Sequence, residues 1–504
     1  MKLGIDFGTT RIVVAAADRG NFPVVSFEDS TGNAHEWIPA LAAVRGAETR
    51  FGWDAWACLP DPSWTPVRSL KRLLESAGPA TRIEIGGGEF PLLDLIAGMA
   101  ACIRRALPAD ETVEAMVGVP ANSNSNQRYL TAEAFRRAGF QVLGLFNEPT
   151  AAGVEYAHAL TRRGEIEERL LVYDLGGGTF DVSLVDLRPG SREVTGTESI
   201  PTLGGDDFDL ALAELILGMP DLEGLSPAEA FHVFERCRAA KESLNPNSRR
   251  AIVELDEGPA AVAVADYYDR CRPMVEETLN AVDDLLEKTG VASPDCLYVT
   301  GGGSELPLVG RMLRERFGRK VKRSAYTRSA TAIGLAILAD GQAGFALRER
   351  FARYFGVWRE ADAGDRIVFD PVFAKGLPLP GAAEPPLKRE REYAPAHNIG
   401  HFRYLESTAV DEDGAPAGNL TLWDEIHFPF DPSLRETSGL AAVPVERALG
   451  VPQKIVESWT CDANGAVEVA ISNETAGYAR RYRLGRWKAE AAALKPAKSR
   501  RRKA

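Results

Sequence analysis

The sequence predicts an α/β protein with two similarly organised halves, followed by an all-β module. Three observations predict this fold class. A glycine-rich loop, with an acid before it and a hydroxyl residue after it, occurs at 4–10 and again at 174–181 between strand-like runs. Apolar strands alternate with helical patterns in both halves, which is typical of an α/β protein. From about residue 341 onward, prolines and hairpin signals replace the helical periodicity.

The first half opens with a β-meander that carries the first glycine loop on its first turn. We expect its strands at 2–7, 12–17 and 24–27. Later strands are expected at 115–119 and 140–146. Apolar periodicity and the stop signals Gly78, Pro108 and Gly139 predict helices, which fall at 67–77, 92–107 and 127–138, with a further helix opened by Pro149.

The second half restarts the same pattern at Arg169, with a strand running into the second loop and a strand running out of it. Further strands are expected at 193–199 and 296–299, separated by helical patterns. A third glycine loop at 301–304 follows an apolar strand, and a small-residue helix at 330–338 closes the unit.

Residues 351–486 read as an all-β module. Alternating apolar residues flank the turn at 462–465, which predicts a hairpin. The basic segment 487–504 reads as a disordered, solvated end. The predicted domains are therefore a nucleotide-binding unit at 1–340, with lobes at about 1–168 and 169–340, a linker at 341–350, the β module and the tail.

Composition limits the class of protein. A chain of 504 residues is long enough for two to four domains. Its net charge of −12 argues against general nucleic-acid binding. Six scattered cysteines without a Cys-x-x-Cys pair favour free thiols in a reducing compartment. No apolar run reaches membrane-spanning length and no signal-peptide layout is evident, so we expect a cytoplasmic protein that binds no membrane.

The two glycine loops suggest phosphate binding. Unblocked backbone N–H groups in such turns form a nest for phosphate oxygens. Threonine hydroxyls add donors, and the aspartates can hold a hydrated magnesium ion. Because each loop opens one half of the chain, a duplicated scaffold that grips one nucleotide from both sides is predicted.

Six motifs occur along the first part of the chain, at 4–10, 71–73, 147–152, 174–183, 203–209 and 301–304. In this order they resemble the motifs of heat shock protein 70 chaperones, the DnaK-like members of the actin/hexokinase ATPase superfamily. The resemblance covers nearly all of 1–340. It implies a two-lobed, actin-like ATPase fold with duplicated ribonuclease H-like lobes, followed by a β-sandwich-like domain.

The resemblance also assigns roles to individual residues. It implies that the catalytic groups are Lys71, Glu148, Asp174 and Thr179. It implies that magnesium and its waters are held by Asp6, Asp174 and Asp181. The residues implied to bind the nucleotide come from the three glycine loops, the 203–209 motif and one lysine. They are Gly8, Thr9, Thr10, Gly176, Gly177, Gly178, Gly204, Gly205, Lys241, Gly301, Gly302, Gly303 and Ser304.

Taken without the resemblance, some of these residues have plainer interpretations. Lys71 fits a solvated lysine with a packed stem. Glu148 fits a turn residue before a proline, and Asp181 fits a solvent-facing strand residue. Asp6 and Asp174 end apolar strands, where an acid needs a partner or water.

Several positions depart from the family pattern. Glu242 replaces the usual basic or apolar residue beside the adenine, and Arg238 stands where a glutamate is usual. Leu306 stands where an arginine is common, and Arg328 where an aspartate is common. We therefore expect phosphate chemistry to be retained while nucleotide affinity or base preference differs. The segment 211–245 is shorter than its family equivalent, so a nucleotide-exchange partner is doubtful.

The region after 340 resembles the family's peptide-binding β-sandwich more faintly, at 374–380 and 459–469. Such a module would bind an extended segment by β-strand addition. The family's leucine-rich acidic linker is replaced at 345–351, and we expect no helical lid because only about twenty residues follow the last expected strand. A groove without a lid should release its client faster.

The expected function is that of an ATP-dependent chaperone that hydrolyses ATP and couples its nucleotide state to binding of unfolded or extended polypeptide. ATP or ADP, Mg²⁺ and K⁺ are the expected cofactors, and co-chaperones are doubtful because the linker and second lobe depart from the family. A sugar-type small-molecule kinase, a nucleotide-dependent filament or scaffold protein, and a nucleotide sensor without hydrolysis remain alternatives on the same fold.

Overall fold

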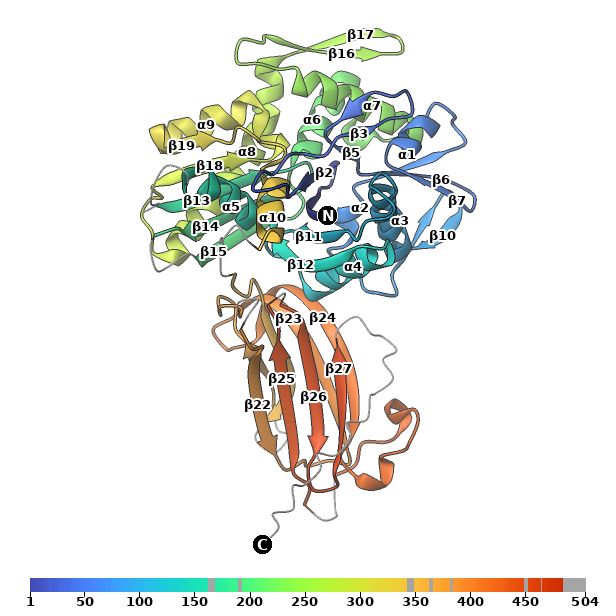
Figure 1. The fold of residues 1–504 in the computed structure, drawn as a ribbon, viewed down its shortest axis with the longest axis vertical. Coiled ribbons are helices and arrows are strands. Elements are labelled where there is room, and N and C mark those ends of the chain that lie inside the picture. The colour runs from blue at the N-terminus through green and yellow to red at the C-terminus, as the bar shows by residue number, and fades with distance from the viewer. Residues whose placement is uncertain are drawn as a thin grey trace. The chain divides into compact units, whose positions relative to one another are not determined.

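The computed structural model describes residues 1–161, 168–188, 193–341, 349–361, 366–380, 384–447, 452–463 and 465–483. These residues form two compact units, shown in Figure 1. The α/β unit comprises Met1–Ser123 and Leu130–Glu349. The β unit comprises Asn124–Tyr129 and Arg350–Ala504. Most of the predicted linker and all of the predicted basic tail lie outside the described residues.

The first glycine loop belongs to a five-stranded sheet with the strand order β12-β11-β1-β2-β5. Strand β1 pairs antiparallel with β2 across the loop and parallel with β11 on its other side. The strands are β1 (Lys2–Phe7), β2 (Arg11–Ala16), β5 (Ile38–Pro39), β11 (Glu114–Val119) and β12 (Gln141–Asn147).

A second five-stranded sheet, with the order β15-β14-β13-β18-β19, repeats this plan. Strand β13 pairs antiparallel with β14 across the second loop and parallel with β18. The strands are β13 (Arg169–Leu175), β14 (Phe180–Asp186), β15 (Glu193–Ile200), β18 (Cys296–Thr300) and β19 (Val321–Arg323). The predicted α/β fold with two similarly organised halves is confirmed.

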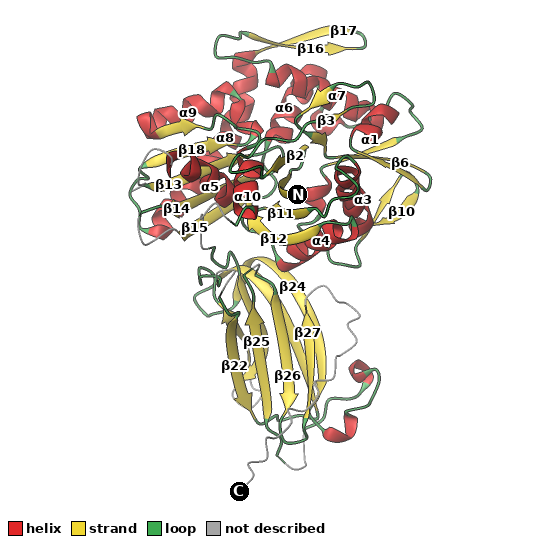
Figure 2. Ribbon diagram, in the orientation of Figure 1, coloured by secondary structure: helices red, strands yellow, loops and turns green. Residues whose placement is uncertain are grey.

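Two helices of small residues, α5 (Glu148–Thr161) and α10 (Ala330–Ala339), pack between the sheets (Figure 2). A Cβ at Gly334 would lie 1.8 Å from the Ala151 carbonyl oxygen, and one at Gly4 would lie 2.1 Å from the Ala336 nitrogen. Glycine therefore allows α10 to approach both α5 and strand β1. This close packing holds the strands that carry the two glycine loops at a fixed separation.

The remaining elements of the α/β unit surround this centre. Its other helices are α1 (Trp53–Cys58), α2 (Leu70–Leu73), α3 (Leu92–Arg105), α4 (Ser125–Arg137), α6 (Gly205–Leu217), α7 (Pro227–Glu242), α8 (Val264–Thr289) and α9 (Pro307–Phe317). Its other strands are β3 (Phe27–Glu28), β4 (Ala34–His35), β6 (Leu41–Arg45), β7 (Glu48–Phe51), β8 (Thr65–Arg68), β9 (Arg82–Ile85), β10 (Gly88–Pro91), β16 (Arg250–Leu255) and β17 (Gly258–Ala263).

Two predicted elements differ from the structure. The helix predicted at 67–77 is only the single turn of α2, because Val67 pairs with Ala42 in a sheet and Ser69 adopts a left-handed φ of 54°. The strand predicted at 24–27 is divided: Val24 forms an isolated bridge to Ala15, whereas Phe27 pairs with His35 in the separate β3–β4 hairpin. Tertiary pairing thus overrides local propensity at both places.

The β unit consists of two four-stranded sheets, with the orders β21-β20-β23-β24 and β22-β25-β26-β27. The predicted hairpin is confirmed: β25 and β26 pair antiparallel from Ile455↔Asn473 to Cys461↔Val467. The strands are β20 (Tyr354–Ala361), β21 (Arg366–Phe373), β22 (Leu387–Tyr393), β23 (Ile399–Val410), β24 (Pro416–Pro429), β25 (Ile455–Cys461), β26 (Val467–Asn473) and β27 (Tyr478–Arg483).

The interior of the β unit combines an aromatic core with a buried ion cluster around Glu457. Trp423, Trp459 and Phe428 are almost fully buried in that core. Glu457 is also fully buried and accepts hydrogen bonds from both terminal nitrogens of Arg359, at 2.9 and 3.0 Å. The Tyr393 hydroxyl donates to the same carboxylate at 2.6 Å. This charge is therefore fully paired, as a buried carboxylate must be to be tolerated.

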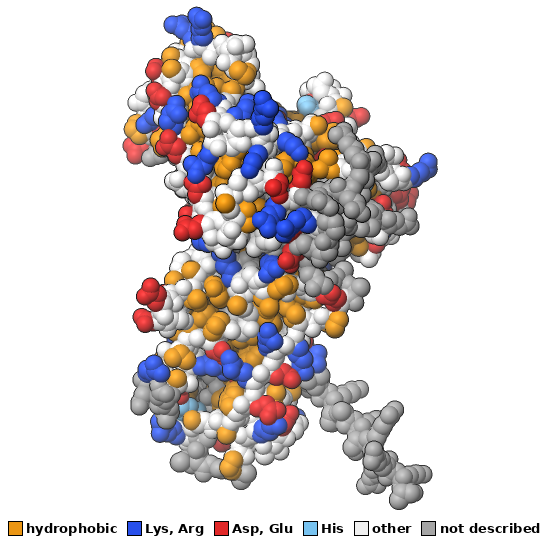
Figure 3. Space-filling view, turned by 90° about the vertical axis from the view of Figure 1, so that its left-hand side faces the viewer, with side chains coloured by type: hydrophobic (Ala, Val, Ile, Leu, Met, Phe, Trp, Pro, Cys, Tyr) orange, Lys and Arg blue, Asp and Glu red, His pale blue; other side chains and the backbone are white. Residues whose placement is uncertain are grey.

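The surface view in Figure 3 shows basic and acidic side chains intermingled on the face that it draws. Among the helices that the structure describes, none combines the length and the apolar character needed to cross a membrane.

Candidate functional site

A cavity of about 460 Å³ lies in the α/β unit where the glycine loops meet. Its volume is within the range of small-molecule sites in proteins. Most of the predicted site residues line it. They are Asp6, Gly8, Thr9, Thr10, Lys71, Glu148, Asp174, Gly176, Gly177, Thr179, Gly205, Lys241, Gly301, Gly302 and Gly303. The other predicted site residues, Gly178, Asp181, Gly204 and Ser304, are not part of this lining.

The first two glycine loops touch each other, and only glycine fits at their contact. A Cβ at Gly177 would lie 2.1 Å from Thr10 Oγ1, and a Cβ at Gly178 would lie 2.5 Å from Thr9 Cγ2. Gly204 supports the second loop from behind, because its Cβ position is 2.6 Å from the Gly177 carbonyl oxygen. The backbones of both loops can therefore approach one ligand together.

The third loop packs against the strand that leads into the second loop. Gly301 has a φ of +82°, and a Cβ there would lie 2.4 Å from Asp174 Oδ1. Ser304 is buried and its hydroxyl donates to the Gly301 carbonyl oxygen at 2.6 Å. The hydroxyl thus holds the loop in shape instead of facing the cavity.

An ion pair lies deep in the cavity. Lys71 of α2 donates its Nζ proton to Glu148, the first residue of α5, and both side chains are buried. Burial raises the pKa of Glu148 to about 7, although Lys71 opposes the rise. Burial alone would lower the pKa of Lys71, but the carboxylates of Glu148 and Asp6 raise it above its ordinary value. The lysine is therefore cationic at neutral pH.

Three aspartates join this pair. Asp174 and Asp181 oppose each other in the β13–β14 register, and Asp6 is the residue before the last of strand β1. Burial raises the pKa of Asp6 and of Asp181. Burial raises the pKa of Asp174 furthest, and the neighbouring carboxylates of Glu148, Asp6 and Asp181 add to the rise. Asp181 is further held by the Ser199 hydroxyl at 2.5 Å.

These four carboxylates share a single ammonium group, that of Lys71, so negative charge is in excess. Such a donor set fits a divalent cation, which would favour the ionised form of each acid. Among the residues that the structure describes, no three His, Cys, Asp or Glu side chains are close enough together to ligate a metal directly.

Asp206, in the first turn of α6, connects most parts of the site. Its carboxylate accepts hydrogen bonds from Thr10 Oγ1 (3.2 Å) and Ser69 Oγ (2.9 Å), and pairs with Arg238 (3.0 Å) and Arg68 (3.4 Å). Its backbone N–H donates to the Gly177 carbonyl oxygen at 2.7 Å. The sequence analysis assigned no role to Asp206, although two acids directly after Gly204-Gly205 were a signal for it.

Lys241 comes from the last turn of α7. This helix begins at a capping box, in which the Ser226 hydroxyl accepts from the Glu229 backbone N–H at 3.3 Å. Lys241 donates to the Gly205 carbonyl oxygen and pairs with the buried Asp209, both at 2.7 Å. Leu306, one of the sequence departures, lies in the hydrophobic core with 3% exposure, so it does not line the cavity.

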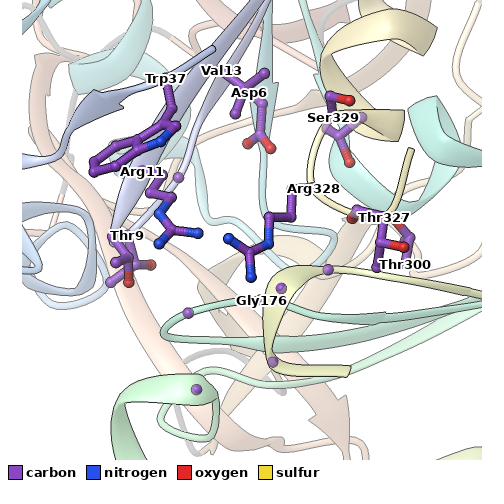
Figure 4. A pocket seen from close by; sticks show the side chains of 18 of the residues that line it. Asp6, Thr9, Arg11, Val13, Trp37, Gly176, Thr300, Thr327, Arg328 and Ser329 are labelled. Atoms are coloured by element: carbon purple, nitrogen blue, oxygen red, sulfur yellow. Dashed lines mark hydrogen bonds between the residues drawn. The ribbon is translucent and has the colours of Figure 1, made fainter. Parts of the chain in front are cut away.

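A cluster of charged side chains also lines the cavity. The sequence pointed to two of its members, Glu242 and Arg328. The Arg11 guanidinium carbon lies 4.6 Å from the Trp37 ring centroid, and both side chains line the cavity (Figure 4). Arg11 Nη2 donates to Glu242 Oε2 at 2.9 Å, and Arg328 Nη1 donates to the same oxygen at 3.2 Å. Arg11 and Trp37 were missed. The position of Arg11 directly after the first loop was an available signal.

Comparisons with known proteins assign the chain to a family. A family model described as Hsp70 protein matches residues 95–349, just over half of the 504 residues. The chain is similar to the chaperone protein HscA homolog of Variovorax paradoxus strain S110, with 31% identity over 68% of the chain and 59% of that protein. It is also similar to that of Pseudomonas fluorescens strain SBW25, with 33% identity over 68% of the chain and 58% of that protein.

A third relative, the chaperone protein DnaK of Mycoplasma mobile, is 26% identical over 94% of the chain and 76% of its own length. The chain thus spans less than two thirds of the length of the two HscA relatives. The family match runs from helix α3 to the end of the α/β unit and includes Glu148, the second and third glycine loops and Lys241. The chain belongs to the Hsp70 family.

Proposed function

We propose that the protein is an ATP-hydrolysing molecular chaperone, in which the nucleotide state of the α/β unit controls polypeptide binding by the β unit. One observation carries the proposal. Two glycine loops, a buried Lys71–Glu148 pair and three aspartates converge on one cavity of about 460 Å³. Transfer of a phosphoryl group to water requires positioned phosphates and positive charge opposite the developing phosphate oxygens.

Each part of the cavity has a role in this proposal. Backbone N–H groups of the first two loops bind the phosphates, and the ammonium of Lys71 lies beside the terminal phosphate. The carboxylate of Glu148 orients the attacking water. Thr179, at the end of the second loop, donates its hydroxyl to a phosphate oxygen. The pKa of Glu148, raised to about 7 by burial, suits a group that accepts a proton near neutral pH.

Asp6, Asp174 and Asp181 are proposed to hold hydrated Mg²⁺ through its waters. The ion would supply positive charge to the phosphates. K⁺ remains a predicted further ion. Lys241 and the third loop, Gly301 to Ser304, are proposed to hold the nucleoside. The backbone of this loop packs closely against the second loop, because a Cβ at Gly303 would lie 2.6 Å from the Gly176 carbonyl oxygen. The third loop therefore lies beside the proposed phosphate site.

The β unit supplies the proposed polypeptide site. Strands β21 and β24 are the edges of one sheet, and β22 and β27 are the edges of the other. An edge strand offers unpaired N–H and C=O groups to an extended chain. On β24, Leu420 and Leu422 are large apolar side chains with more than half of their surface exposed, at 55% and 52%. Extended apolar segments are therefore the proposed clients.

One contact supports communication between the linker and the catalytic residues. Glu349, at the end of the α/β unit, is buried and accepts a hydrogen bond from the Asn147 backbone N–H at 2.8 Å. Asn147 directly precedes Glu148. If Glu148 moves when the terminal phosphate is lost, the neighbouring Asn147 N–H moves with it. Its hydrogen bond would then pass the movement to Glu349 in the linker.

The test is steady-state ATP turnover by the full chain, with and without an unfolded apolar peptide. Wild type is compared with Lys71→Ala and with Lys288→Ala, a matched control whose side chain is 60% exposed. We expect the peptide to stimulate turnover in wild type and in the control, and turnover to fall about 100-fold or more in Lys71→Ala. Normal turnover in Lys71→Ala would remove Lys71 from the mechanism. Phosphorylation of an added sugar would favour a kinase instead.

A further inference from the structure

Where the phosphates bind on the first two loops, the nucleoside must occupy the remainder of the cavity. That remainder includes the third loop and Arg328 beside it, since Arg328 Cγ lies 4.0 Å from the Cβ position of Gly302. Glu242 directly follows Lys241 at the end of α7 and also lines the cavity. Arg11 and Trp37 complete this end (Figure 4). The base is thus met by charged side chains.

These side chains form an ion bridge across the cavity. Glu242 Oε2 accepts from Arg11 Nη2 at 2.9 Å and from Arg328 Nη1 at 3.2 Å. Arg11 follows the first loop, whereas Glu242 and Arg328 come from the second half of the chain. Burial alone would raise the pKa of Glu242, but Arg11 and Arg328 hold it below its ordinary value, so the carboxylate is ionised at neutral pH.

The bridge leaves hydrogen-bonding capacity for a ligand. Glu242 Oε1 forms no hydrogen bond with the residues that the structure describes, and 27% of the Glu242 side chain is exposed. The Arg11 guanidinium lies over the Trp37 ring and donates to Glu242, so two contacts hold it in place. A base can therefore stack on the guanidinium of Arg11. Its edge would then meet Glu242 as a hydrogen-bond acceptor and the arginines as donors.

We infer that this cavity binds guanine nucleotides as well as adenine nucleotides, and that Glu242 and Arg328 determine this choice of base. The inference rests on the proposed nucleotide-binding function and names its substrate class more closely.

The reason lies in the edges of the two bases. Guanine presents two adjacent donors, N1–H and the 2-amino group, which suit a carboxylate, and two acceptors, O6 and N7, which suit a guanidinium. Adenine presents one amino group beside the acceptor N1, so a carboxylate gains at most one hydrogen bond from it. Stacking on Arg11 is available to either base, because every base has a π face. Glu242 therefore adds affinity for guanine that adenine obtains only in part.

The test is displacement of a ribose-labelled fluorescent ADP from the full chain in the presence of magnesium. The competitors are ATP, GTP and inosine triphosphate, which lacks the 2-amino group. We expect the half-displacing concentrations of GTP and ATP to agree within about tenfold, with inosine triphosphate weaker than GTP. Glu242→Leu should weaken GTP relative to ATP by about fivefold or more, and Arg328→Leu should shift the same ratio in the same direction.

Glu257→Gln is the matched control. Glu257 is exposed at a turn of the same unit and does not line the cavity, so its substitution should leave the ratio unchanged. The inference is overturned where ATP displaces the probe and GTP is more than about 100-fold weaker, or where the two leucine variants leave the ratio unchanged. Failure of the labelled ADP and of ATP to bind at all would refute the proposed function itself, and this inference with it.

Discussion

The carboxylate of Glu148 should make the nucleotide-free protein less stable as pH rises, and Glu148→Gln should remove this effect. Glu148 lies deep in the α/β unit with Asp6 and Asp181 nearby, and only Lys71 offsets its charge. The amide of glutamine keeps the shape of the side chain without ionising. We therefore expect the variant to be more stable than wild type at alkaline pH while its ATP turnover falls about 100-fold or more.

The size of the effect follows from the pKa. Burial raises the pKa of Glu148 from its ordinary value of 4.5 to about 7. Below pH 4.5 the Glu148 carboxyl is protonated in both the folded and the unfolded chain, so it does not lower the free energy of unfolding. Between pH 4.5 and about 7 the unfolded chain loses its proton first, so the folded state loses stability as pH rises. The full loss corresponds to about 3 kcal/mol.

The assay is urea unfolding of the metal-free and nucleotide-free full chain at pH 5 and pH 8. At pH 8 the free energy of unfolding of Glu148→Gln should exceed that of wild type by about 3 kcal/mol, and at pH 5 the difference should be much smaller. Glu257→Gln, at an exposed turn of the same unit, should match wild type at both pH values. A pH-independent difference, or a less stable variant at pH 8, would refute the reasoning.

Three further substitutions test the packing and the buried charges. Asp206→Asn removes the charge that two arginines share, and should lower the free energy of unfolding by about 3 kcal/mol; an unchanged thermal midpoint would contradict the role given to this residue. Gly334→Ala places a Cβ 1.8 Å from the Ala151 carbonyl oxygen, and should cost about 3 kcal/mol or prevent folding; wild-type solubility and melting would argue against the close helix contact. Glu457→Gln removes one of the two carboxylates that pair with Arg359, leaving Asp370 at 2.7 Å, and should destabilise the β unit alone by about 2 kcal/mol, which proteolysis of that unit measures.

Much of the fold followed from the sequence because local pattern and tertiary structure agree. The strands around both glycine loops and the hairpin at β25 and β26 lie where apolar alternation predicted them. Prediction and structure differ where a strand partner distant in the sequence determines the local conformation. Val67 was predicted to be helical from its apolar spacing, but it pairs with Ala42, which lies in a strand 25 positions earlier. No local signal reports such a partner.

In the candidate site, too, local patterns could be predicted from the sequence, whereas long-range contacts could not. Glycines and acids beside strand ends were identifiable because their spacing is local. The four partners of the Asp206 carboxylate come from three separate segments. The contact of Arg11 with Trp37 and Glu242 likewise joins residues distant in the chain. Sequence alone could name Glu242 as unusual, but it could not show that two arginines hold it in place.

The most direct test of the central claim is the rate at which a labelled unfolded peptide leaves the full chain in ATP and in ADP. Nucleotide control of the β unit requires that the client bind the two nucleotide states differently. We predict fast release in ATP and slower release in ADP. After ATP has been given time to turn over, release should slow to the ADP rate in wild type but stay fast in Lys71→Ala, which keeps its ATP. Slow release at the same rate in both nucleotides, with ATP bound, would contradict the account.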